Sequence, residues 1–278
     1  MAPAKINLSL DVLGVRRDGF HEILTVMHCL ALHDTLGIET REDGVITVES
    51  SDPGVPSGSG NIVYKAADLL RREFGCNRGA RIYIEKNIPV AAGLAGGSAD
   101  AAAALKCLNR LWGINADSRA LFRLGEKVGS DVPFCLMGNA ALAGGRGEAL
   151  TPLPALSGIG VVLVKPPFGV STARVYGLYD TLPPGRHPDT MAVAGALKKG
   201  DLKALAGLLG NALERVTASL YPEILEIKEA LTAAGAVGSL MSGSGPTVFG
   251  LCADPVEAGY VASRLKLPGC RIIVTETL

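Results

Sequence analysis

The sequence has no excess of either charge and no long apolar run. Lysine plus arginine and aspartate plus glutamate each number 27 among 278 residues. A general nucleic-acid-binding protein would need a basic excess, so this balance argues against that class while leaving room for a local basic pocket. No apolar stretch approaches the roughly 18 residues of a membrane span, and the N-terminus lacks the apolar region of a signal peptide. We therefore expect a cytoplasmic protein with neither a nucleic-acid nor a membrane partner.

Cysteines are few and scattered, which argues against a zinc knuckle. The six lie at positions 29, 76, 107, 135, 252 and 270, each among apolar residues. Free thiols in a reducing compartment are therefore expected. Hydrophobic residues make up 48% of the chain and charged residues 19%, which is typical of a globular protein with an ample core. One large domain or two of ordinary size fit this length.

A glycine-rich stretch follows a strand-like segment at 81–88 and precedes an alanine-rich helical pattern at 99–112. A strand, glycine loop and helix in this order aim free backbone N–H groups at an anion, and Ser98 could cap the helix or turn its hydroxyl to a phosphate or metal ion. The stretch has neither the Lys-Ser/Thr of a P-loop nor the spacing G-x-G-x-x-G. It indicates a nucleotide-phosphate loop whose cation comes from elsewhere, or a tight turn of small residues. The loop residues are Pro89, Val90, Ala91, Ala92, Gly93, Leu94, Ala95, Gly96, Gly97, Ser98 and Ala99.

Three polar residues outside this loop are further candidates. Lys5 and Asn7 share one face of an alternating segment at 4–12, which places a cation beside an amide, although the pattern alone favours a solvated strand face. His21 follows a glycine turn, and a lone histidine is more often structural. Asp131 lies just after a predicted helix at 118–128, among apolar residues. It could be a cap or turn residue, or a positioned acid or base, and the pattern favours a cap or turn residue.

The second half of the chain is predicted to be β-α-α-α-β-α-β, with helices on one face of an antiparallel sheet. Pro152 and Pro154 mark the expected boundary, so the predicted domains are 1–153 and 154–278. A loop is expected at 183–185. The other predicted elements are strands at 160–165, 247–252 and 271–275, a helix starting at Ser171 or Thr172, helices at 190–198, 202–216 and 222–235, and a last helix after Asp254.

Three motifs carry a resemblance to a known superfamily. Pro3–Leu8, Pro89–Ser98 and Leu240–Pro246 resemble, in order and separation, the motifs of the galactokinase, homoserine kinase, mevalonate kinase and phosphomevalonate kinase (GHMP) superfamily. Arg17–His21 and Gly129–Phe134 resemble its members that phosphorylate 4-(cytidine 5'-diphospho)-2-C-methyl-D-erythritol, a precursor in the non-mevalonate isoprenoid pathway. The likeness covers essentially the whole chain.

The resemblance implies an α+β fold of two domains, the first ribosomal-protein-S5-like and the second ferredoxin-like, with the active site in a cleft between them. It implies transfer of the γ-phosphoryl group of ATP to the substrate's 2-hydroxyl. Asp131 matches the catalytic aspartate, which would orient that hydroxyl and accept its proton. Lys5 matches the catalytic lysine, which would keep Asp131 ionised and neutralise charge on the phosphoryl group. Loop residues Pro89–Ala99 would wrap the ATP phosphates, with Mg²⁺ bridging them and Ser98 as a candidate metal ligand.

The same resemblance implies the substrate contacts. His21 would read the cytosine edge, Phe20 could stack near the base, and Asn7 would bind near the substrate hydroxyl. Thr172 and Tyr176 match further substrate contacts through a looser alignment. Ala95 departs from the family's frequent glycine, so the loop must tolerate a Cβ atom there.

Two alternatives remain open at this point. Another GHMP small-molecule kinase, of the homoserine or mevalonate type, is opposed by the Phe20-His21 pair and the short chain. A non-catalytic nucleotide-binding protein on this fold is opposed by the presence together of Lys5, Ser98 and Asp131. The oligomeric state is expected to be a monomer or a weak homodimer.

Overall fold

The structure, a computed structural model, describes residues 1–183 and 185–278. The chain forms two compact units, each assembled from separated stretches. The first unit contains Met1–Ala4, Leu32–Val90 and Ala95–Gly138, and the second contains Lys5–Ala31, Ala91–Leu94 and Asn139–Leu278. The glycine-rich loop therefore contributes residues to both units. The predicted boundary after residue 153 stays a prediction.

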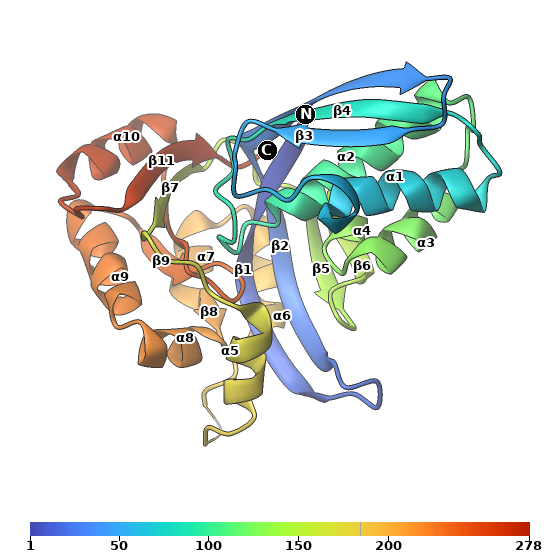
Figure 1. Cartoon of the computed structure of the whole chain (residues 1–278). Helices are drawn as coiled ribbons and strands as arrows, with labels where there is room; N and C mark the ends of the chain where they lie inside the picture. Colours follow the sequence, from blue (N-terminus) through green and yellow to red (C-terminus); the bar gives the residue numbers. More distant parts are fainter. Residues whose placement is uncertain (184) are drawn as a thin grey trace. The chain divides into compact units, whose positions relative to one another are not determined.

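The first unit packs helices on a small sheet of order β3-β4-β2, as Figure 1 shows. Strands β2 and β4 are antiparallel, whereas β3 and β4 are parallel. A shared apolar core joins the helices to β3 and β4. The elements are β2 (His21–Arg41), of which the later part lies in this unit, β3 (Ile46–Ser50), β4 (Gly79–Glu85), a 3-10 turn at Gly58–Gly60, α1 (Ile62–Glu73), α2 (Gly96–Leu111), α3 (Ser118–Val128) and α4 (Val132–Met137).

Local sequence explains why α1 and α2 form and why they pack together. Asn61 caps α1, because its side chain accepts a hydrogen bond from the Val63 backbone N–H. Alanines dominate the buried face of α2, among them Ala101 and Ala104. Small side chains let a helix lie close to its neighbours, and α1 and α2 share an extensive contact.

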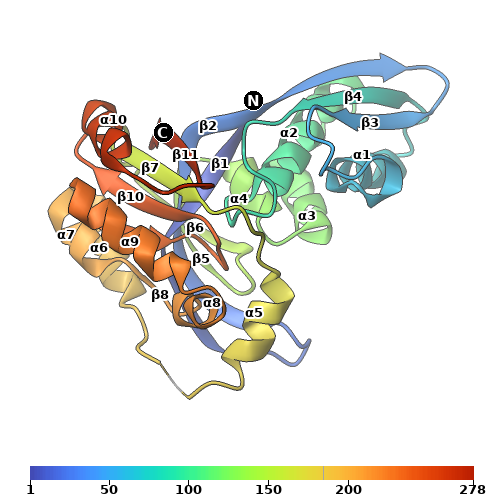
Figure 2. The ribbon, with the colours of Figure 1, turned by 60° about the vertical axis from the view of Figure 1, so that its left-hand side comes forward.

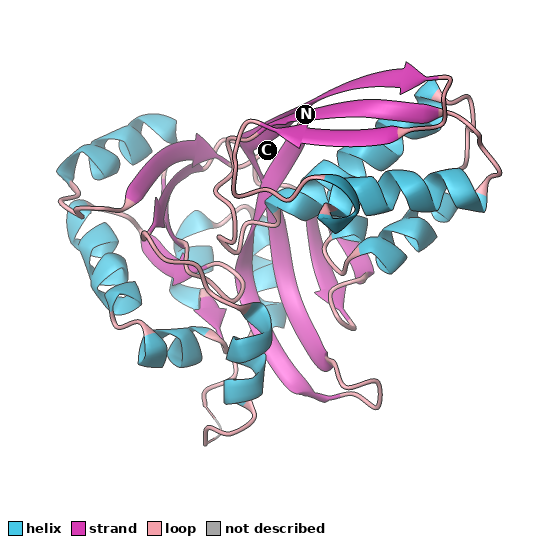
Figure 3. Cartoon of the chain, viewed as in Figure 1, coloured by secondary structure: helices cyan, strands magenta, loops and turns pink. Residues whose placement is uncertain are grey.

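The second unit contains a hairpin of β1 and β2 extended by β8 and β5, and a separate antiparallel sheet of order β11-β7-β10-β9. Helices α9 and α10 pack against that second sheet, as Figure 2 shows. Both units combine helices with strands (Figure 3), and most of the strand pairs are antiparallel, so the predicted α+β class is confirmed. The elements are β1 (Ala2–Val15), β5 (Ala140–Gly144), β6 (Ala149–Leu153), β7 (Gly160–Lys165), α5 (Thr172–Tyr179), α6 (Thr190–Lys199), α7 (Leu202–Leu208), β8 (Gly210–Asn211), α8 (Glu214–Leu220), α9 (Glu223–Ala234), β9 (Gly238–Met241), β10 (Val248–Cys252), α10 (Pro255–Arg264) and β11 (Arg271–Glu276).

The predicted helix at 202–216 is wrong. Helix α7 ends at Leu208, strand β8 pairs in parallel with β1, and α8 begins at Glu214. Gly210 lies so close to Pro188 that a Cβ atom on it would be 2.7 Å from the proline Cβ. The interruption therefore depends on a contact that helical periodicity cannot reveal. The predicted loop at 183–185 includes residue 184, which lies outside the described residues.

Several simpler expectations are confirmed. All six cysteines are free thiols, and Cys29 and Cys252 are buried. The side chain of Asp254 caps α10 by accepting hydrogen bonds from two backbone N–H groups. Among residues 1–183 and 185–278, no helix has the length and apolar composition that crossing a bilayer requires.

Protonation of His28 is expected to destabilise the protein as the pH falls below about 6.5. His28 is fully buried, with Nδ1 2.8 Å from the Cys29 carbonyl oxygen, and Nε2 accepts from the Leu156 backbone N–H at 3.0 Å. Burial lowers the pKa of His28 from its ordinary 6.5, although the hydrogen bond to Cys29 opposes this shift. The unfolded chain thus binds the proton at higher pH than the folded one. The stabilisation is complete above about pH 6.5 and is lost as the pH falls toward the folded pKa.

Urea unfolding between pH 8 and pH 5 tests this expectation. Below pH 6.5 the wild type should lose stability faster than His28→Gln, by up to about 1.4 kcal/mol per pH unit. Parallel curves for the wild type and His28→Gln would contradict the expectation.

Candidate functional site

The glycine-rich loop enters α2 through left-handed backbone positions. Ala91, Gly93 and Ala95 have φ values of 50°, 75° and 56°, so the loop does tolerate a Cβ atom at Ala95. Helix α2 begins at Gly96, earlier than predicted, with Ala95 at the N-cap position. The prediction of Ser98 as the cap is therefore wrong, because the turn at Ala95 starts the helix three residues sooner.

The start of α2 offers backbone donors in a row. Its first helical hydrogen bond runs from the Ala99 N–H to the Ala95 carbonyl (2.9 Å). The N–H groups of Gly96, Gly97 and Ser98 precede that bond and so have no partner within the helix. Such a helix N-terminus is suited to an anion, because donors and helix dipole act in the same direction.

In the second unit, three sequence motifs meet at Ser242. The Ser242 hydroxyl donates to the Gly93 carbonyl oxygen at 3.0 Å and accepts from the Asn7 backbone N–H at 3.3 Å. A Cβ atom on Gly93 would lie 2.3 Å from the Ser242 carbonyl oxygen, so glycine is required there. A Cβ atom on Gly243 would lie 3.4 Å from the Gly93 carbonyl oxygen. The first motif, the loop and the third motif are thus in direct contact.

Lys5 and Asn7 are buried, at 4% and 2% exposure, so the solvated strand face that the pattern favoured is wrong. The Lys5 ammonium donates to Asn7 Oδ1 at 2.6 Å, and the Lys5 backbone N–H donates to the Leu94 carbonyl at 3.1 Å. Asn7 Nδ2 donates to Thr25 Oγ1 at 2.8 Å. Strand β1 is paired with β2 and with β8, which removes the exposed edge that a lone strand would have.

In the first unit, Ser98 lies near the segment that carries Asp131. A Cβ atom on Gly129 would be 3.9 Å from Ser98 Oγ. Asp131 is half-buried at the N-cap position of α4, yet its carboxylate makes no capping hydrogen bond. The Asp131 side chain is therefore not a helix cap, although the residue does lie in the turn before α4.

A buried ion triad, formed by Lys86, Asp34 and Asp100, lies next to the loop and was missed by the sequence analysis. The Lys86 ammonium contacts Asp100 Oδ2 at 2.8 Å and also pairs with Asp34. The second oxygen of Asp34 accepts the backbone N–H groups of Asn87 (2.6 Å) and Ile88 (2.8 Å). The triad thereby joins β2, the chain entering the loop and the N-terminal half of α2. The available sequence signal was a lysine before the loop and an aspartate just after it.

Burial dominates the electrostatics of this triad. It raises the pKa of Asp100 to about 7, against the opposing effect of Lys86. Burial also lowers the pKa of Lys86, but the charges of Asp100 and Asp34 outweigh it and leave that pKa above its ordinary value. Asp100 Oδ1 is buried without a hydrogen bond. Within the triad, Asp100 is therefore held through its other oxygen, which contacts the Lys86 ammonium.

The residues predicted to contact substrate are partly gathered in the second unit. His21 Nε2 lies 2.8 Å from Asp180 Oδ1, and the His21 and Tyr176 rings have centroids 4.6 Å apart. The Phe20 side chain is exposed, with the Arg146 guanidinium 5.0 Å from its ring centroid. Asp180 and Arg146 were missed, since both lie far from His21 in sequence.

Thr172 and Asn7 make different contacts from those of His21, Tyr176 and Phe20. Thr172 Oγ1 is 2.8 Å from Ser244 Oγ, so it touches the third motif, as Asn7 does through Ser242. The structure therefore divides the predicted substrate residues into an aromatic group at the β1–β2 hairpin and a hydroxyl and amide group at the third motif.

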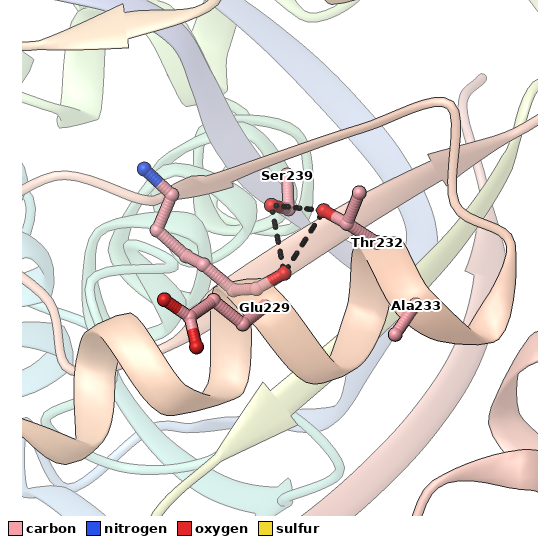
Figure 4. Close-up of a pocket in the computed structure, with 5 residues that line it drawn as sticks. Glu229, Thr232, Ala233 and Ser239 are labelled. Carbon is pink, nitrogen blue, oxygen red and sulfur yellow. Dashed lines mark hydrogen bonds between the residues drawn. The ribbon is translucent and has the colours of Figure 1, made fainter.

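A shallow hollow of about 480 Å³ lies elsewhere, on α9 and β9 (Figure 4). The hydroxyl groups that line it are hydrogen-bonded within the protein, because Thr232 Oγ1 and Ser239 Oγ both donate to the Lys228 carbonyl, at 3.0 Å and 3.2 Å. It contains no residue of the predicted site. The hollow is lined by Lys228, Glu229, Thr232, Ala233 and Ser239.

Comparison with known proteins identifies the family of the chain. A family model described as the GHMP kinases N terminal domain matches residues 61–139, and one described as GHMP kinases C terminal matches 193–269. The chain is 52% identical over 280 residues to the 4-diphosphocytidyl-2-C-methyl-D-erythritol kinase of Pelotomaculum thermopropionicum, covering 100% of this chain and 96% of the relative. It is 48% identical to the protein of that name from Acetivibrio thermocellus, covering 100% and 98%.

Solved structures show the same fold. A crystal structure of 4-(cytidine 5'-diphospho)-2C-methyl-D-erythritol kinase, 36% identical, covers 99% of this chain and 97% of its own with a TM-score of 0.82. A homoserine kinase from Cytophaga hutchinsonii, 19% identical, covers 100% and 95% with a TM-score of 0.68. The second likeness concerns the fold alone.

Proposed function

The chain belongs to the GHMP kinase family, and on that premise we propose that it transfers the γ-phosphoryl group of ATP to the 2-hydroxyl of 4-(cytidine 5'-diphospho)-2-C-methyl-D-erythritol. It is an ATP-dependent small-molecule kinase with the two-domain α+β fold of that family. The observation that carries the phosphoryl-transfer chemistry is the contact of Asn7, Gly93 and Ser242, which brings the three motifs together. The acceptor is inferred from the relatives, which match over nearly their full lengths.

The loop supplies the phosphate site in this proposal. The N–H groups of Gly96, Gly97 and Ser98 would hold ATP phosphate oxygens, and Gly93 lets the loop pack closely on the Ser242 backbone. Within the described residues no three or more His, Cys, Asp and Glu side chains cluster as a metal site. Mg²⁺ fits nonetheless, since it is usually held by substrate phosphates and one or two protein oxygens, with Ser98 as the proposed ligand. When bound, Mg²⁺ would neutralise charge on the phosphates.

Asp131 and Lys5 carry the proposed catalytic roles. Asp131 would orient the acceptor hydroxyl and accept its proton, and the Lys5 ammonium, held by Asn7 at 2.6 Å, would stabilise negative charge on the phosphoryl group. Positioning and charge stabilisation are expected to supply most of the rate in phosphoryl transfer. General-base assistance adds about 10²–10⁴-fold.

The aromatic group at the hairpin is proposed to bind the cytosine. His21 presents a hydrogen-bonding ring whose orientation is set by Asp180 and Tyr176. Phe20 offers an exposed π face that suits stacking on a base. Thr172 and Asn7, at the third motif, would contact the remainder of the substrate. We further propose that the kinase acts in the cytoplasm as a monomer or weak homodimer, without nucleic-acid or membrane partners, a view supported by its balanced charge.

A substrate panel tests the proposed function. With ATP and Mg²⁺, the purified chain should phosphorylate the cytidine diphosphate compound, and ³¹P NMR should show one new phosphomonoester at the 2-position. Homoserine and mevalonate lack the cytosine, so their kcat/KM should be lower by about 10⁴-fold, the discrimination typical of a site built on hydrogen bonds. Phosphate on homoserine or mevalonate alone would overturn the substrate. Nucleotide binding without turnover of any acceptor would favour the non-catalytic alternative.

A further inference from the structure

The segment from Asn211 to Thr217 holds the third glycine motif, although the sequence analysis assigned it no role. It contains β8 and the start of α8, and β8 touches both β1 and β9 (Figure 1). Asn211, Glu214 and Thr217 each place a polar side chain on the backbone of residues 241–244. We name these three side chains the α8 clamp.

Asn211 makes the densest set of contacts in the α8 clamp. Its Nδ2 donates to the carbonyl oxygens of Met241 (2.8 Å) and Gly243 (2.7 Å). Its Oδ1 accepts from the Leu213 N–H at 2.9 Å, and its backbone pairs with Leu10 of β1. All the hydrogen-bonding groups of this amide are therefore used, and they join β1 to the third motif.

Glu214 and Thr217 complete the α8 clamp. Glu214 Oε2 accepts the Met241 backbone N–H at 2.9 Å, while Oε1 pairs with Lys228 at 2.5 Å. Thr217 is fully buried, and its hydroxyl donates to the Ser244 carbonyl at 3.1 Å. Buried backbone carbonyls are costly to leave unpaired, so the loop is favoured in this one conformation.

We propose that Asn211, Glu214 and Thr217 are positioning residues for the ATP phosphate loop, acting through Ser242. The clamp fixes the backbone on both sides of Ser242, and the Ser242 hydroxyl in turn binds the Gly93 carbonyl and the Asn7 N–H. Gly93 packs directly on this backbone, since a Cβ atom added to it would lie 2.3 Å from the Ser242 carbonyl oxygen. The inference rests on the proposed function, because it assumes that Gly93 belongs to a phosphate site.

The experiment compares nucleotide affinity in matched variants. Thr217→Val removes one hydroxyl at constant shape, Thr217→Ser retains it, and Asn211→Asp removes both amide donors. Isothermal titration calorimetry with the non-hydrolysable ATP analogue AMP-PNP and Mg²⁺ needs no acceptor substrate. We expect Kd to rise at least about tenfold in Thr217→Val and Asn211→Asp, the equivalent of one lost hydrogen bond, and to stay within about twofold of the wild type in Thr217→Ser.

Thr232→Val is the control, because its hydroxyl also donates to a backbone carbonyl, that of Lys228, but does not touch the third motif. Hydrogen–deuterium exchange should become faster at 91–94 and 241–246 in the two clamp variants and stay unchanged there in Thr232→Val. Wild-type Kd and exchange in Thr217→Val would overturn the inference, even if Asn211→Asp failed to fold. A wild-type protein that bound no AMP-PNP would instead overturn the proposed function.

Discussion

Asp131→Ala is expected to lower kcat by at least about 10²–10⁴-fold, the usual contribution of a positioned acid or base, while the AMP-PNP Kd stays near that of the wild type. The physical reason is that this carboxylate is half-buried at the start of α4 and yet makes no capping hydrogen bond there. The loss should be in orientation and deprotonation of the acceptor hydroxyl, which is measured by ADP release at saturating ATP.

Asp117→Ala provides the matched control. Asp117 also stands before a helix, but its carboxylate does cap α3, accepting the Ala120 N–H at 2.7 Å. Its loss should reduce the free energy of unfolding by about 0.5–2 kcal/mol without changing kcat. Asp131→Ala should instead lower kcat. Near-normal turnover in Asp131→Ala would show that the role assigned to this residue is incorrect.

Lys86→Met is expected to reduce the free energy of unfolding by about 3–5 kcal/mol, as removal of one partner from a buried ion pair does. The Lys86 side chain is 5% exposed, and the carboxylates of Asp34 and Asp100 are 0% and 3% exposed. Without the ammonium, two carboxyl groups would remain close together in the interior, where an unpaired charge is costly. Urea unfolding at 25 °C measures the change.

Two further variants decide whether burial is the reason. Lys127→Met makes the same substitution in an exposed pair, since the Lys127 side chain is 56% exposed and 3.4 Å from Glu73, and should cost no more than about 1 kcal/mol. Adding Asp100→Asn to Lys86→Met should recover part of the lost stability by removing one uncompensated carboxylate. Equal losses in Lys86→Met and Lys127→Met would contradict the buried-triad explanation.

Local signals in the sequence predicted most elements correctly. The last helix was predicted to follow Asp254, and the Asp254 side chain does accept backbone hydrogen bonds at the start of α10. The incorrect predictions concern segments whose backbone conformation depends on contacts with residues far away in the sequence. At 202–216, Gly210 packs on Pro188 and the Asn211 side chain bonds to residues 241 and 243. At Ser98, a left-handed alanine three residues earlier starts the helix instead.

The sequence by itself determined the family, because the order and spacing of the motifs around Lys5, Gly93, Asp131 and Gly243 can be read without knowing any contact. Only the tertiary structure decided that Lys5 is buried against Asn7, that Lys86 joins two aspartates, and that the clamp holds the third motif. The reason is separation along the chain. Asn7 and Ser242 stand 235 residues apart and yet share a hydrogen bond, and such pairings depend on how sheets and helices pack, which periodicity does not encode.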